Sequence, residues 1–176
     1  SGKEYLTVGV LDSGIALIPH LKPWLDERRY TAYDESEVDR SHGTFVAGVL
    51  LYGDELEGQD WVGGGEFKLL DATVFPKRGV RIDEDELLDI QNAIRAYPDV
   101  KLWNLSGGGM TECGSRDFSD FGKALDDLQK QYGIVICKSA GNCDNFKSSL
   151  PKRRIPISAD SVLSLVVGSI AHAQQE

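Results

Sequence analysis

The sequence predicts an α/β fold, a doubly wound and mostly parallel sheet with helices on both faces. Five short segments are rich in β-branched residues and almost continuously apolar, the pattern of strands buried on both faces; they cover residues 5–11, 67–75, 100–105, 134–138 and 162–170. Apolar residues spaced by three or four predict helices over residues 43–52, 83–97 and 119–132. Because strand and helix alternate, we expect right-handed crossovers between parallel strands.

Several elements carry signals at their ends. The first predicted strand is followed by an acid, Asp12, and the first predicted helix comes directly after His42. The second helix opens on four consecutive acids at 83–86, which the positive end of the helix dipole favours and which we therefore do not interpret as a metal site. The segments 53–65 and 76–82 are predicted as loops.

Length and composition favour a globular protein with one domain over residues 1–176. Hydrophobic residues make up 41% of the chain and charged residues 27%, which is typical of a folded, soluble protein. The net charge of -9 argues against nucleic acid or an anionic membrane as the main partner, because both would repel the chain. No apolar run approaches the ~20 residues that span a bilayer, so we expect no membrane contact.

The three cysteines, Cys113, Cys137 and Cys143, are an odd number without the paired spacing of metal ligands. Cys137 falls inside an apolar strand and is predicted as a small core residue. Reduced thiols in a cytoplasmic protein are the favoured interpretation. A secreted protein stays open as the alternative, because the sequence need not begin at the amino terminus of the whole protein.

Polar residues follow three separate predicted strands: Asp12, the stretch Ser106-Gly107-Gly108, and Asn142. In open parallel sheets ligands bind beyond the carboxyl ends of the strands, so these residues are expected along one edge. Taken singly, Asp-x-Gly and Gly-Asn are ordinary turn sequences, and a histidine near a helix start is often a solvent-facing neighbour of the cap. Together they favour acid–base chemistry, with the Asp12 carboxylate holding the His42 imidazole at roughly 2.6–3.2 Å.

Three strings in this order carry a family resemblance. Val-Gly-Val-Leu-Asp-Ser-Gly lies at 8–14, Ser-His-Gly-Thr-Phe-Val-Ala-Gly-Val at 41–49 and Lys-Ser-Ala-Gly-Asn at 138–142. They resemble the subtilisin-like serine proteases. The similarity covers residues 5–172, and it includes Leu-Trp-Asn-Leu-Ser-Gly-Gly at 102–108.

The resemblance implies a serine endopeptidase with a polypeptide substrate. Asp12 and His42 would be two members of the catalytic triad, and the Asn142 amide would stabilise the oxyanion. The walls of the substrate cleft would be formed by Ser106, Gly107, Gly108, Ala140 and Gly141. No cofactor is expected, and calcium has no support because the loop at 53–65 lacks the Asn-rich calcium-binding sequence of many secreted members. The resemblance also brings the loops of Cys113 and Cys143 to one end of the sheet, so a disulfide between them is the alternative to reduced thiols.

The family's nucleophile segment, Gly-Thr-Ser-x-Ala, does not occur in this chain. Ser106, Ser139 and Ser169 lack that context, and none is assigned as nucleophile. Two hypotheses follow: a protease whose C-terminal part, with the serine, is missing, so that this chain alone is inactive, or a non-catalytic peptide-binding or regulatory module. For the truncated protease, we expect the last strand, 162–170, or its neighbouring face to form a contiguous apolar patch, unless another chain or the missing segment covers it. A nucleotide-binding domain is disfavoured, because no Gly-x-Gly-x-x-Gly follows the first strand.

Overall fold

The computed structural model describes residues 4–58, 66–77, 83–107, 111–141 and 154–168. Within them, six parallel strands form one sheet in the order β2-β3-β1-β4-β5-β6. The strands are β1 (Thr7–Asp12), β2 (Leu25–Thr31), β3 (Lys68–Thr73), β4 (Leu102–Leu105), β5 (Val135–Ser139) and β6 (Leu165–Val167). From β1 the chain crosses to the edge strand β2 and returns to β3 beside β1, and it then adds β4, β5 and β6 on the other side of β1. This is the doubly wound arrangement that the sequence predicts.

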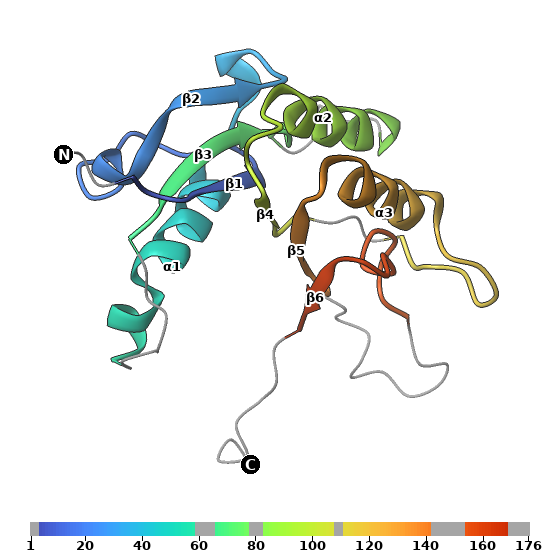
Figure 1. The fold of residues 1–176 in the computed structure, drawn as a ribbon. Coiled ribbons are helices and arrows are strands. Elements are labelled where there is room, and N and C mark those ends of the chain that lie inside the picture. Colours follow the sequence, from blue (N-terminus) through green and yellow to red (C-terminus); the bar gives the residue numbers. More distant parts are fainter. Residues whose placement is uncertain (1–3, 59–65, 78–82, 108–110, 142–153, 169–176) are drawn as a thin grey trace.

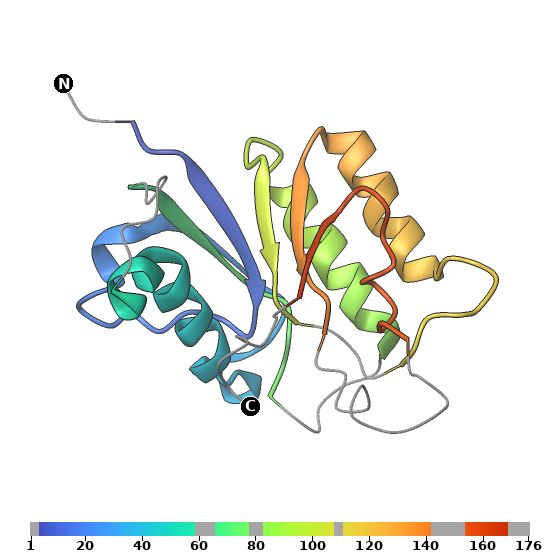
Figure 2. The ribbon, with the colours of Figure 1, turned by 90° about the horizontal axis from the view of Figure 1, so that it is seen from below.

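Helices cover both faces of this sheet, as Figures 1 and 2 show. The α-helices are α1 (Ser41–Glu57), α2 (Asp83–Ala96) and α3 (Asp120–Tyr132), and two short 3-10 helices are η1 (Lys22–Trp24) and η2 (Glu35–Glu37). α1 lies on one face beside β1 and β3, whereas α2 and α3 lie together on the other face. We call these the α1 face and the α2/α3 face.

Each face has its own hydrophobic cluster. The larger one joins the sheet to α2 and α3 and contains the fully buried indole of Trp103. The smaller one joins Val8 and Val10 of β1 to Val46 of α1. Because side chains alternate along a strand, the positions that follow Val8 and Val10 on the same face lead to Asp12. Strand geometry therefore puts Asp12 on the α1 face, at the carboxyl end of the central strand.

One strand of the sheet, β2, was absent from the predicted elements. Its sequence, Leu-Asp-Glu-Arg-Arg-Tyr-Thr, carries four consecutive charged residues and has neither the apolar run nor the alternation that marks a strand. β2 pairs only with β3, in the order given, and its middle residues are exposed. Charged side chains are common on edge strands, where they discourage pairing with other chains.

The first helix is longer than predicted. It begins at Ser41 instead of 43, so that His42 is inside its first turn, and it continues to Glu57 instead of 52. Residues 53–57 of the predicted loop are therefore helical. Gly58 ends the helix in the left-handed conformation, with φ of 62°. Residues 59–65 and 78–82 of the two predicted loops lie outside the described residues.

The last predicted strand, 162–170, is shorter in the structure, where β6 covers Leu165–Val167. The Asp126 carboxylate of α3 accepts hydrogen bonds from the amides of Val162 (3.1 Å) and Leu163 (2.9 Å), so these residues turn toward α3 instead of pairing with β5. Burial on both faces was also predicted wrongly here, because all three residues of β6 are exposed. Cys137 of β5, predicted in the core, is only partly buried.

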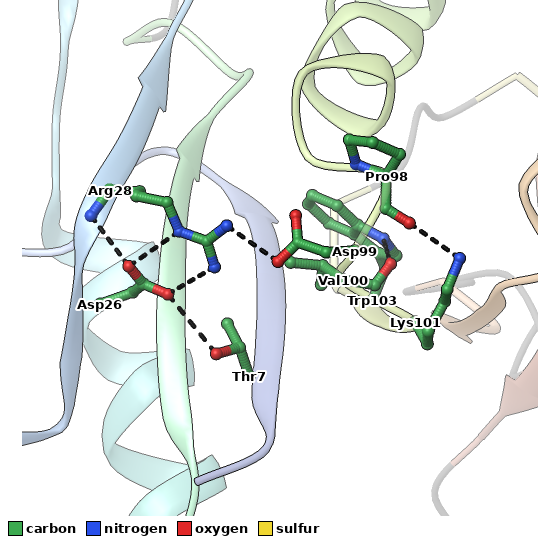
Figure 3. Close-up of polar contacts among 8 residues, drawn as sticks. All are labelled: Thr7, Asp26, Arg28, Pro98, Asp99, Val100, Lys101 and Trp103. Carbon is green, nitrogen blue, oxygen red and sulfur yellow. Dashed lines mark hydrogen bonds and ion pairs between the residues drawn. The ribbon is translucent and has the colours of Figure 1, made fainter. Parts of the chain in front are cut away.

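The amino ends of the strands are tied together by Arg28, as Figure 3 shows. Its guanidinium donates to Asp26 of the same strand (2.8 Å) and to Asp99 before β4 (2.8 Å). Thr7 of β1 donates to the same Asp26 carboxylate at 3.4 Å. The Arg28 guanidinium lowers the pKa of Asp26, which is the direction expected for an acid paired with a cation. This network is partly exposed and lies at the end of the sheet away from Asp12.

Candidate active site

Asp12 and His42, thirty positions apart in the sequence, are in contact in the structure. His42 Nδ1 lies 2.7 Å from Asp12 Oδ1, within the predicted range. Asp12 is 1% exposed, whereas the side chain of His42 is 57% exposed. Since a carboxylate only accepts hydrogen bonds, Nδ1 is the donor and Nε2 is left to accept a proton from a group in front of the ring.

Close packing of glycine against backbone makes this contact possible. A Cβ atom on Gly43, the residue after His42, would lie 2.3 Å from the carbonyl oxygen of Gly14. Gly14 itself has φ of +96°, a conformation that favours glycine. The Gly43 amide donates to Ser13 Oγ at 3.2 Å, which joins the start of α1 to the loop after β1. The glycines thus let the helix start approach the strand end closely enough for the imidazole to reach the carboxylate.

The Asp12 carboxylate is only partly satisfied. Oδ1 accepts from the Ser13 amide at 2.7 Å as well as from His42. Oδ2 is buried and has no hydrogen-bond partner among the described residues. The carboxylate that accepts from Nδ1 fixes the ring in the tautomer whose Nε2 can accept a proton. The pair is therefore suited to general base chemistry.

Four of the residues predicted to line the substrate cleft are described by the structure, and they lie at the ends of β4 and β5: Ser106, Gly107, Ala140 and Gly141. Ser139 Oγ donates to the carbonyl of Ser106 at 2.9 Å, and Asn104 Nδ2 donates to Ser106 Oγ at 2.8 Å. Glycine is required at both walls: a Cβ on Gly107 would meet the Phe75 ring at 2.2 Å. Residues Ala140 and Gly141 follow Ser139 at the end of β5, and Gly141 has φ of +83°. Gly108 and Asn142 lie outside the described residues.

Sequence reasoning missed two charged residues beside this cleft. Lys138, the penultimate residue of β5, is 1% exposed, and its ammonium donates to the carbonyl of Ser139 at 2.8 Å and to Ser139 Oγ at 3.0 Å. Burial lowers the pKa of Lys138 to about 8, and the charge of Glu86 opposes that shift. Glu86, in the first turn of α2, is 5% exposed. The sequence signal that could have found Lys138 is a charged residue inside an apolar strand. Glu86 has no such signal, because the acidic run at 83–86 is explained by the helix start.

The described residues contain no group of three or more His, Cys, Asp or Glu side chains arranged to hold a metal ion. They also contain no helix with the length and apolar character needed to cross a membrane. Cys113 forms no disulfide with another described residue, and Cys143, its partner in the alternative pairing, lies outside the described residues.

Comparison with known proteins gives one family and a set of similar folds. The profile of the subtilase family matches residues 3–176. Among solved structures, the chain is similar to a variant of the protease domain of PatA, with 21% sequence identity, a TM-score of 0.60, and coverage of 94% of this chain and 58% of that one. It is similar to MycP1 without its N-terminal propeptide, with 18% identity, a TM-score of 0.56, and coverage of 94% and 57%.

A third similar structure is the CspB protease of Clostridium perfringens, with 20% identity and a TM-score of 0.53, covering 78% of this chain and 35% of that one. A search of curated protein sequences found no match. At these identities the structural likeness establishes the fold. The chain also spans less than two-thirds of the length of each of these proteins.

Proposed function

The chain belongs to the subtilase family, and on that premise we propose that it is part of a serine endopeptidase that cleaves polypeptides. One observation carries the proposal: a buried carboxylate, Asp12, lies 2.7 Å from the imidazole of a largely exposed histidine, His42. The carboxylate holds the imidazole in one tautomer, which leaves the other ring nitrogen to act as the base. The subtilase fold is that of serine proteases, so this chemistry fits the fold.

In the proposed mechanism a serine beyond residue 176 is the nucleophile. His42 Nε2 takes the proton from the serine hydroxyl as its oxygen attacks the scissile carbonyl carbon. The carbonyl oxygen then becomes an oxyanion, to which the Asn142 amide donates a hydrogen bond. His42 returns its proton to the leaving amine as the C–N bond breaks, and water releases the acyl group by the same steps in reverse order. The proposed steps need no metal or cofactor, because side chains carry out every proton transfer.

The α1 face carries exposed apolar side chains, which supports the proposal that a further segment packs on it. Strand alternation and register put Val135, Leu165 and Val167 on this face, where they are 41%, 58% and 64% exposed. Phe45 and Val49, one turn apart on α1, are 68% and 45% exposed. We propose that the C-terminal segment carrying the serine covers this surface, or else that another chain does. A non-catalytic peptide-binding module is the second candidate, and it shares the predicted cleft at the ends of β4 and β5.

A fluorophosphonate probe, which reacts with activated serines, tests the proposal. The protein extended by its downstream reading frame should be labelled at the serine of a Gly-Thr-Ser-x-Ala segment. The change His42→Ala should abolish labelling, and His20→Ala, which removes a histidine outside the site, should not. The 176-residue chain alone should stay unlabelled, because removing the nucleophile of a subtilisin costs about 10⁶ in kcat, a value taken from that enzyme.

Two results would contradict this assignment. Labelling of the 176-residue chain at Ser106 or Ser139 would show that the nucleophile is misplaced. An extended protein that contains the segment but is not labelled would favour the peptide-binding module. Covering of the α1 face is tested separately: the extended protein should bind less of a hydrophobic dye than the 176-residue chain, and a clean monomer of the short chain without dye binding would contradict the missing segment.

A further inference from the structure

Lys138 is a charged residue in a position where an apolar one would be more stable. It lies on β5 between the sheet and the helices of the α2/α3 face, and it is 1% exposed. Burying an ammonium group costs free energy unless it is paired and hydrogen-bonded. Replacing such groups by apolar side chains of similar size is often neutral or stabilising. The lysine therefore calls for an explanation other than stability.

The hydrogen bonds of Lys138 lead directly to the cleft. Its ammonium donates to both the carbonyl and the hydroxyl oxygen of Ser139, at 2.8 and 3.0 Å. Ser139 Oγ has a single proton, and it donates that proton to the carbonyl of Ser106 at 2.9 Å. The Ser139 hydroxyl thus accepts from Lys138 on one side and donates to Ser106 on the other. The chain of contacts crosses from the end of β5 to the end of β4.

Glu86 supplies the opposite charge. It lies in the first turn of α2 and is 5% exposed, and its charge raises the pKa of Lys138 against the larger effect of burial. Among the described residues it is the charged group that acts on Lys138. A lysine near the amino end of a helix is disfavoured by the helix dipole, and an acid in that first turn offsets the effect. Glu86 therefore favours the charged form of the lysine whose hydrogen bonds lead to Ser139.

We propose that Lys138 is a positioning residue which, with Glu86 as its counter-charge, holds Ser139 against Ser106 so that the ends of β4 and β5 keep the spacing needed to bind an extended peptide. This inference rests on the proposed function, because it takes those two strand ends as the walls of a peptide cleft. Main-chain pairing along a strand end tolerates many side chains, so the spacing of the walls matters more than their sequence. Lys138 acts through Ser139 and does not touch the substrate.

The first test uses the extended protein and fluorescein-labelled casein. In Lys138→Met the KM should rise about tenfold while kcat changes less than about twofold, because an interaction that binds substrate and transition state equally is lost. The KM of the unchanged protein should rise above pH 8, as the ammonium loses its proton. In Lys138→Arg this rise should vanish, because a guanidinium stays charged. An unchanged KM in a folded Lys138→Met protein would overturn the proposal.

The second test needs no activity. In the 176-residue chain, the ε-carbon resonance of Lys138, identified by its absence from Lys138→Met, should titrate near pH 8, and Glu86→Gln should lower that midpoint. A midpoint at the ordinary lysine value of about 10.4 would overturn the proposal. If the extended protein is neither labelled by the fluorophosphonate nor cleaves casein, the proposed function fails. Lys138 is then judged by the Kd for labelled casein, which should rise about tenfold in Lys138→Met and would overturn the proposal if it did not.

Discussion

The two faces of the sheet are covered to different extents. Under α2 and α3 the sheet contributes to a continuous core, with Trp103, Ile136 and Ile94 fully buried. On the α1 face the cluster is smaller, and beyond β1 the strands carry exposed side chains such as Val135 and Leu165. Asp12 and His42 both belong to the less covered face. Among the described residues, the α2/α3 face is therefore largely covered, whereas the α1 face, which carries Asp12 and His42, remains partly open to solvent.

The comparison predicts its largest effect at Trp103, at the centre of the α2/α3 face. Trp103→Ala should lower the free energy of unfolding by about 3–5 kcal/mol, because a large buried side chain leaves a cavity. Urea unfolding followed by far-ultraviolet circular dichroism measures the loss. If this variant does not fold, Ile136→Val keeps the measurement quantitative, with a loss of about 0.5–1.5 kcal/mol. A loss below about 1 kcal/mol in a folded Trp103→Ala protein would mean that this face is not the core.

The second effect concerns the buried charge on the same face. Burial lowers the pKa of Lys138 to about 8, so between pH 8 and 10.5 the unfolded chain binds more protons than the folded one. Stability contributed by this group must therefore rise with pH across that window, by about 3 kcal/mol in total.

Lys138→Met removes this pH dependence. The difference in unfolding free energy between the unchanged protein and Lys138→Met, measured in urea at several pH values, isolates the effect from other titrating groups. A difference that stays constant from pH 7 to 10.5 would show that Lys138 is not desolvated in the folded chain.

A matched pair of glycines gives a third, smaller effect. A Cβ on Gly9 of β1 would lie 2.1 Å from the Trp103 ring, whereas a Cβ on Gly48 of α1 would meet nothing within 4 Å. Gly9→Ala should cost about 1–3 kcal/mol through overpacking. Gly48→Ala should add up to about 1 kcal/mol through helix propensity. Equal midpoints in thermal unfolding for the two variants would contradict the difference between the faces.

The smallest effect is expected on the exposed part of the α1 face. Leu165→Thr and Val167→Thr should each change the free energy of unfolding by less than about 0.5 kcal/mol, because both side chains are already in solvent. The same changes should reduce the fluorescence of a bound hydrophobic dye. Losses above about 1 kcal/mol would indicate that these side chains are covered in the isolated chain.

The sequence predicted the contact between Asp12 and His42 because both residues follow local signals and because the order of the motifs resembles the subtilisin-like proteases. An apolar strand placed Asp12 at its carboxyl end, and apolar periodicity placed His42 at a helix start. β2 could not be predicted in this way, because the stability of a charged edge strand comes from pairing with β3 and not from its own pattern. The same limit applies to the predicted strand 162–170, because the amides of its residues Val162 and Leu163 donate to Asp126 of α3 and only Leu165–Val167 form β6. The surroundings of Lys138 depend on where α2 packs, which no local pattern contains.

The position of β1 at the middle of the sheet has a consequence for biosynthesis. β1 is made first, yet it pairs with β3 and β4, which begin at Lys68 and Leu102. At about 5–20 residues per second, roughly 5–20 s pass between the synthesis of β1 and that of its second partner. Until β3 is made, the apolar strand β1 has no partner, and until β4 is made it is paired on one side only. Until both partner strands are made, the unpaired edges of β1 are available for pairing with other chains.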